Sequence, residues 1–91
     1  MNREDLSRKH KATLDKICHR PILGTIPWND IEKLFKALGA EIEEREGSRI
    51  AVIFDGFAPH VFHRPHPEKV TDKGAVASVK AMLKKNFPDL L

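Results

Sequence analysis

The apolar positions in the middle of the chain follow a helical period. From residue 28 to residue 38 they recur every three or four positions: Trp28, Ile31, Leu34, Phe35 and Leu38. This spacing places them on one face of an amphipathic helix. Asp30 and Glu32 favour the first turn electrostatically, and Gly39 provides a left-handed stop. The pattern predicts a helix over 28–38.

The pattern then changes to that of β-strands. Residues 40–45 alternate between apolar and charged, which is typical of an edge strand, and residues 47–48 form the next turn. Residues 49–54 are apolar and β-branched, as in a buried central strand. The Asp55-Gly56 pair predicts a two-residue type I′ hairpin, so that residues 57–63 form a third, antiparallel strand.

The last third of the chain predicts a loop and a second helix. Two prolines, at 65 and 67, rule out a regular ladder and indicate an extended loop to about residue 70. Thr71 or Asp72 caps a helix near 73–85 that has Val76, Val79, Met82 and Leu83 on one face. Two amphipathic helices need one apolar sheet face to cover. We therefore expect an α+β fold, a two-layer α-β-β-β-α sandwich of the double-stranded-RNA-binding-domain type.

The N-terminal segment has a weaker pattern. Ser7 can cap a helix as far as Cys18, but its apolar stripe is thin (Ala12, Leu14 and Ile17), which predicts a marginal helix. Pro21 and Gly24 then interrupt the chain. We expect a basic extension over residues 1–24 and one domain over 25–91, since 91 residues leave room for one modest core.

Charge and cysteine content narrow the class of protein. The net charge of +3 is unevenly distributed, because residues 1–20 and 48–91 are basic whereas residues 21–47 are acidic. A basic surface favours phosphate, although an ordinary solvated mixed-charge surface is the alternative. One cysteine excludes an intramolecular disulfide and fits the reducing cytoplasm. No apolar run approaches the ~20 residues of a membrane span, and we expect neither a signal peptide nor a membrane partner.

Four short motifs then occur in a characteristic order: Leu38-Gly39-Ala40, Glu46-Gly47-Ser48, the run from Phe62 to Pro67, and Lys73-Gly74. In this order, and at these places relative to the expected helices and strands, the sequence resembles the HicA family, also called YcfA-like, of type II toxin–antitoxin toxins. The resemblance covers about residues 25–86. It implies a small ribonuclease that cleaves mRNA without a metal or other cofactor. It also implies the double-stranded-RNA-binding-domain-like fold and a HicB-type antitoxin that covers the active face.

One position departs from the family pattern. Members usually carry Gly-Ser-His at the start of the second strand, with a catalytic histidine, whereas this chain has Gly47-Ser48-Arg49. An arginine stays protonated near neutral pH and cannot act as a general base. Two functions therefore remain open: an mRNA endoribonuclease that takes its imidazoles from elsewhere, and a non-catalytic module of the same fold that binds nucleic acid or a partner.

Histidines at the end of the third strand are the candidates for proton transfer. In an antiparallel pair this end lies beside the start of the second strand, so His63 should approach Arg49. We expect His66 and His63 to be catalytic, and RNA to contact Gly47, Ser48, Arg49, Arg64, Lys69 and Lys73. The alternative is that both histidines are loop residues packed on prolines. A third alternative is a small metal-binding protein built on His60, His63 and His66, which would need a tight turn of the chain to reach one ion.

Overall fold

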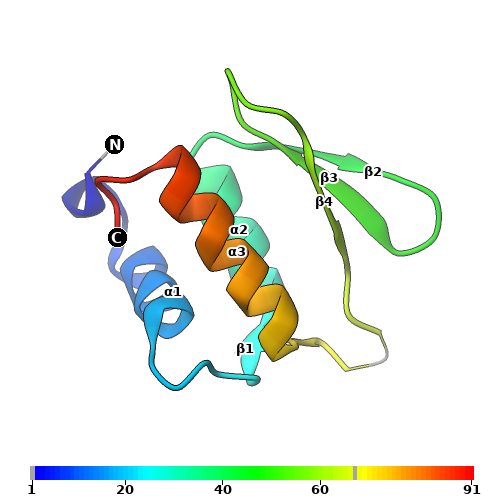
Figure 1. Cartoon of the computed structure of the whole chain (residues 1–91), viewed down its shortest axis with the longest axis horizontal. Helices are drawn as coiled ribbons and strands as arrows, with labels where there is room; N and C mark the ends of the chain where they lie inside the picture. Colours follow the sequence, from blue (N-terminus) through cyan, green and yellow to red (C-terminus); the bar gives the residue numbers. More distant parts are fainter. Residues whose placement is uncertain (1, 67) are drawn as a thin grey trace.

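The computed structural model describes residues 2–66 and 68–91 as two layers, with the helices on one side and a three-stranded sheet on the other (Figure 1). The fold is α+β, as the sequence predicts. In chain order the elements are η1 (Arg3–Asp5), α1 (Arg8–Cys18), β1 (Ile26–Pro27), α2 (Trp28–Ala37), β2 (Glu41–Glu44), β3 (Arg49–Ile53), β4 (His60–His63), β5 (Val70–Thr71) and α3 (Lys73–Asn86). Within the described ranges no helix has both the length and the apolar composition needed to cross a membrane.

Helices α2 and α3 confirm the helical pattern of the sequence. Gly39 follows α2 with a φ of +96°, the left-handed conformation expected of a glycine stop. At the other helix, the carboxylate of Asp72 accepts a hydrogen bond of 2.8 Å from the backbone N–H of Ala75 and caps α3. Both helices bury their apolar stripes in a common core, and Phe35 of α2 and Leu83 of α3 are fully buried.

The larger sheet is antiparallel, with the strand order β2-β3-β4. Its inner residues belong to the core: Ile50 lies opposite Phe62, and both are buried. The register also places Arg49 directly opposite His63. Directly opposite residues project from the same face of a sheet, and both of these side chains are exposed. The sheet therefore presents an Arg49–His63 pair to solvent at one end of β3 and β4.

The predicted type I′ hairpin is wrong. Residues 54–59 connect β3 to β4, so the third strand begins at His60 instead of residue 57. Phe54 leaves the sheet to pack its ring on Phe87, at 5.1 Å between centroids, and the N–H of Phe57 bonds to the carbonyl of Phe54 at 3.1 Å. Gly56 has a φ of +85°, but no described non-glycine residue has a positive φ, so Asp55 does not adopt the conformation that type I′ requires.

A second, two-stranded sheet was not predicted. β1 pairs antiparallel with β5, with Ile26 opposite Thr71. The N–H of Trp28 continues this contact by donating to the carbonyl of Lys69 at 3.0 Å. The chain that leaves β4 through the proline-rich loop is therefore tied to the start of α2 just before it enters α3.

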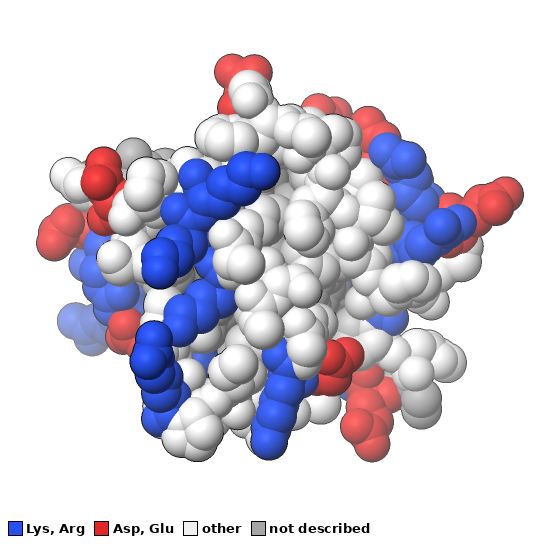
Figure 2. All heavy atoms as spheres, viewed as in Figure 1, with Lys and Arg blue, Asp and Glu red and all other residues white. Residues whose placement is uncertain are grey.

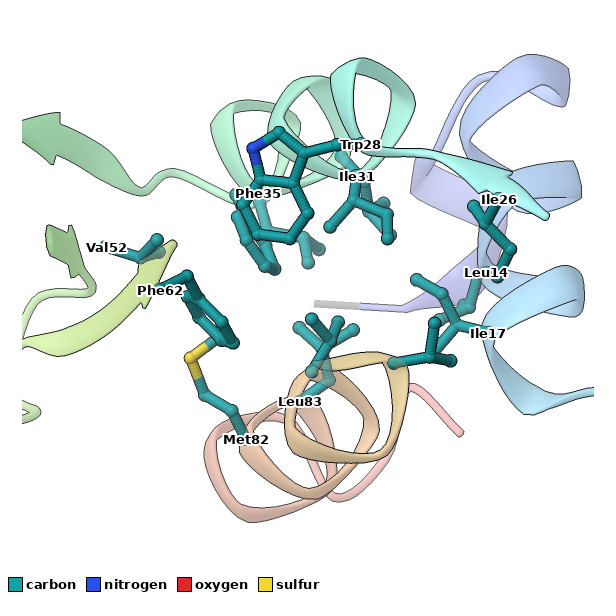
Figure 3. Packing of buried hydrophobic residues seen from close by; sticks show 14 of the residues in the cluster. Leu14, Ile17, Ile26, Trp28, Ile31, Phe35, Val52, Phe62, Met82 and Leu83 are labelled. Atoms are coloured by element: carbon teal, nitrogen blue, oxygen red, sulfur yellow. The ribbon is translucent and has the colours of Figure 1, made fainter. Parts of the chain in front are cut away.

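The predicted N-terminal helix forms as α1, and it is buried more deeply than its thin apolar stripe suggests. The Ser7 hydroxyl caps it by accepting from the N–H of His10 at 3.2 Å. Leu14 and Ile17 are fully buried. Figure 3 shows both side chains pointing into the space between α2 and α3, towards Leu83. Helix α1 thus shares the core of the residues that follow it.

Candidate catalytic site and nucleic-acid interface

The Gly47-Ser48-Arg49 turn lies against the end of β4. Besides the Arg49–His63 pair, the backbone N–H of Arg64 donates to the carbonyl of Ser48 at 2.8 Å. Gly47 has a φ of +68°, so the turn uses the backbone freedom of glycine. The predicted proximity of His63 and Arg49 is confirmed.

His63 and His66 line one depression of about 230 Å³. Its other walls come from the segment after β4 and from the start of α3: Arg64, Pro65, Thr71, Asp72 and Ala75. Two imidazoles thus face a small concave space. Such a pair can supply both a proton acceptor and a proton donor to a ligand held there.

Two lining residues, Thr71 and Asp72, were predicted from the sequence only as alternative caps of the last helix and not as site residues. Thr71 is 1% exposed, and its hydroxyl has no hydrogen-bond partner among the described residues. Asp72 lines the depression while it caps α3. The only signal in the sequence was their place at a helix start directly after a proline-rich loop.

Arg64 does not project freely into solvent. Its guanidinium donates to the two carboxylate oxygens of Glu32 at 2.8 and 3.0 Å, and to Glu44 at 2.6 Å. Hydrogen bonds with Glu32 and Glu44 hold the pKa of Arg64 above its ordinary value. This arginine, expected as a phosphate ligand, instead joins the segment after β4 to α2 and β2.

Glu32 is the buried centre of this network, at 8% exposed. Its carboxylate also accepts a hydrogen bond of 2.5 Å from the indole N–H of Trp28. Burial alone would raise the pKa of the Glu32 carboxyl, but the hydrogen bonds from Arg64 and Trp28 outweigh it, and the net pKa is lowered. Glu32 therefore carries a charge that Arg64 compensates.

Neither of the two predicted lysines lines the histidine depression, although Lys73 directly follows Asp72, which does. Lys69 lines a neighbouring groove with Trp28, Asn29 and Glu32, and this groove shares only Arg64 and Pro65 with the depression. The side chain of Lys73 lies beside Gly24 of the N-terminal segment. A Cβ atom added to Gly24 would lie 3.4 Å from the Cγ of Lys73.

The structure thus places the Gly47-Ser48-Arg49 turn beside His63 and Arg64, and His66 shares the depression with those two residues. Arg49 lines a separate depression with Arg45, Glu46 and Val61, where its Nε donates to the carbonyl of Glu46 at 3.2 Å. Lys69 and Lys73 line neither depression.

The third histidine of the run has a different environment. The ring of His60 stacks on Phe62 at 4.4 Å between centroids, on the face of β4 opposite to His63. Among residues 2–66 and 68–91, no three His, Cys, Asp or Glu side chains come together as a potential metal site.

Comparison with protein families gives one match. The model of a family described as "HicA toxin of bacterial toxin-antitoxin" matches residues 28–85. The matched stretch runs from the start of α2 almost to the end of α3, and α1 lies outside it. Neither the curated proteins nor the solved structures gave a match.

Proposed function

Because this chain belongs to the HicA family of bacterial toxin–antitoxin toxins, a family that implies an antitoxin partner, we propose that it is a cytoplasmic mRNA endoribonuclease. It binds RNA at the end of β3 and β4, cleaves it without a metal ion, and is inhibited by a HicB-type antitoxin.

One observation carries the catalytic part of the proposal: His63 and His66 line the same depression, and His63 lies directly opposite Arg49. Arg49 stands where the family usually has its histidine. The cross-strand position is the nearest place on the same face from which an imidazole can reach that point. In this proposal the catalytic imidazole is supplied by His63 on β4 instead of by the residue at position 49 on β3.

The chemistry uses the reactivity of RNA itself. One neutral imidazole accepts the proton of the 2′-hydroxyl as this oxygen attacks the adjacent phosphorus. The other imidazole, protonated, donates to the departing 5′-oxygen. The products are a 2′,3′-cyclic phosphate and a free 5′-hydroxyl, and the proton count balances. The guanidinium of Arg49 stabilises the negative charge that develops on the phosphate oxygens.

The second candidate function is a non-catalytic module that binds RNA or the antitoxin. The observation that favours it is Arg49 itself, because an arginine at the family's histidine position strengthens phosphate binding while removing a base.

Cleavage of a long unstructured RNA by the purified protein tests the proposal. The reaction is run with and without EDTA, beside His63→Ala and His66→Ala. The matched control is His19→Ala, because His19 is an exposed histidine that follows α1 and does not line the depression. We expect cleavage by the wild type and by the control in EDTA, and a loss of at least about a hundredfold in each site variant.

Three outcomes contradict the proposal. Cleavage that stops in EDTA means a metal-dependent reaction. Unchanged cleavage by both site variants means that the chemistry lies elsewhere. Salt-sensitive RNA binding without any cleavage by the wild type identifies the binding module instead.

A further inference from the structure

Helix α3 carries a row of lysines on the side that faces the N-terminal segment. Lys73, Lys80 and Lys84 follow one another at steps of seven and four residues, which places them on one face of a helix. We call these three residues the lysine strip. Figure 2 shows Lys and Arg side chains gathered over α3 and α1 on this side of the molecule.

Two observations locate the strip. The side chain of Lys73 lies beside Gly24, as described above. Helix α1 contacts the helix α3 that carries Lys80, and the charge of Lys80 opposes the rise that burial causes in the pKa of the Cys18 thiol at the end of α1. The lysine strip therefore runs along the junction between α3 and the N-terminal segment, and α1 contributes to the surroundings of its lysines.

The strip has one acidic neighbour in the sequence, Asp72, whose carboxylate caps α3. Helix α3 has no acidic residue between 73 and 86. The single acidic residue of α1, Asp15, is paired with Arg3. None of the ion pairs among the described residues includes Lys73, Lys80 or Lys84. A positively charged surface whose lysines form no ion pairs attracts a polyanion.

We infer that the lysine strip binds the phosphate backbone of RNA and leads the strand to the histidine depression. The strip begins at Lys73, next to Asp72, which lines that depression. From there to Lys84 it extends for about 16 Å along the helix, enough for several phosphates. The inference rests on the proposed function for the identity of the polyanion.

An acidic protein is the competing partner, and the composition of the surface favours RNA. The centres of protein interfaces are enriched in aromatic residues and depleted in lysine. The large hydrophobic side chains that are exposed on the described residues, Ile22, Phe57, Val61, Val70 and Leu91, all lie outside α1 and α3. A surface of lysines without apolar anchors suits phosphate contacts.

The test compares two double variants of the full chain. Lys80→Gln/Lys84→Gln removes two charges of the strip. The matched control, Lys33→Gln/Lys36→Gln, removes two charges from exposed positions of α2. Binding is measured by fluorescence anisotropy across a salt series, with a labelled unstructured RNA whose 2′-hydroxyls are methylated so that it cannot be cleaved.

We expect the strip variant to bind on the order of tenfold more weakly near 0.1 M salt, with a log–log salt slope shallower by about 1.4. The control should keep the affinity and slope of the wild type. Circular dichroism verifies folding. If the double variant does not fold, Lys84→Gln alone, at an exposed position, is measured with an expected slope change of about 0.7.

Each other outcome overturns the inference. Equal losses in the strip and control variants indicate a general charge effect. RNA binding by the strip variant with the affinity and salt slope of the wild type leaves the proposed function intact and refutes the strip alone. Loss of antitoxin binding without loss of RNA binding assigns the strip to a protein partner. No RNA binding by the wild type refutes both proposals together.

Discussion

Arg64, which follows β4, and Glu32 of α2 form a bidentate ion pair. The Nε and Nη2 atoms of Arg64 lie 2.8 and 3.0 Å from the two carboxylate oxygens of Glu32. The pair fixes the point at which the chain turns away from the sheet, directly between His63 and His66. The positions of the two candidate catalytic residues therefore depend on an interaction that neither of them makes.

Replacing Arg64 with alanine should destabilise the protein by about 2 kcal/mol, because it leaves the carboxylate of Glu32 buried without its partner. The estimate is below that for a fully buried pair because the Arg64 side chain is 35% exposed. The free energy of unfolding in urea, followed by the fluorescence of Trp28, measures the loss.

Arg45→Ala is the control for this variant. Arg45 pairs with Glu43 at 3.3 Å, and both side chains are nearly half exposed. Such a surface pair contributes less than about 1 kcal/mol. Equal losses in the two variants would show that the Arg64–Glu32 pair is no stronger than a surface contact.

Stability should also depend on pH through Glu32. Its pKa in the folded protein is lower than the ordinary value of 4.5. The unfolded chain therefore binds this proton more readily, so the stabilisation is fully present above about pH 4.5 and is lost as the pH falls through the folded value. The difference in unfolding free energy between wild type and Glu32→Gln should narrow as the pH falls below about 4.5.

Other carboxylates also titrate in that range, so the comparison needs a second variant. Glu43→Gln alters a carboxylate in an exposed pair, and its stability relative to the wild type should change little over the same pH range. A Glu32→Gln difference that stays constant with pH argues that the ion pair does not stabilise the fold.

Leu14→Ala should cost about 3 kcal/mol, because Leu14 is fully buried and its removal leaves a cavity between α1 and the other helices. Lys9→Ala, at an exposed position of the same helix, should change stability by less than about 0.5 kcal/mol. Urea unfolding of both variants decides whether α1 is part of the cooperative core. A Leu14→Ala variant as stable as the wild type contradicts the burial of α1.

The elements that were predicted correctly are those whose pattern is local. Helices α2 and α3 carry repeated apolar positions and stop or cap signals, and a helix needs nothing further to be recognised. The pairing of Arg49 with His63 was also predictable, because antiparallel geometry brings the end of one strand to the start of its neighbour.

The features that were missed depend on contacts between distant residues. Glu32 and Glu44 lie 32 and 20 positions from Arg64, so no local pattern indicates that they occupy its guanidinium. Asp55-Gly56 has the composition of a tight hairpin, but the packing of Phe54 on Phe87 draws the chain out of the sheet first. The burial of α1 depends on its packing against the other helices, where Leu14 and Ile17 join the core whereas Ala12 stays exposed.

The last prediction separates the two roles of Asp72, which caps α3 and lines the histidine depression. Asp72→Ala should lower the free energy of unfolding by about 1 kcal/mol through the lost cap, and Ser7→Ala should have a similar effect on α1. Asp72→Asn should keep most of the stability, because asparagine also caps helices well.

Of these two cap residues only Asp72 lines the depression. Removing its carboxylate removes the cap that holds the first turn of α3 beside His63 and His66. At a temperature where all variants are folded, Asp72→Ala should therefore cleave RNA more slowly than Ser7→Ala, although the two are equally destabilised. RNA cleavage rates measured beside urea unfolding make this comparison. Equal rates in the two variants mean that the wall formed by α3 has no part in the reaction, and that the histidines act from the side of β4 alone.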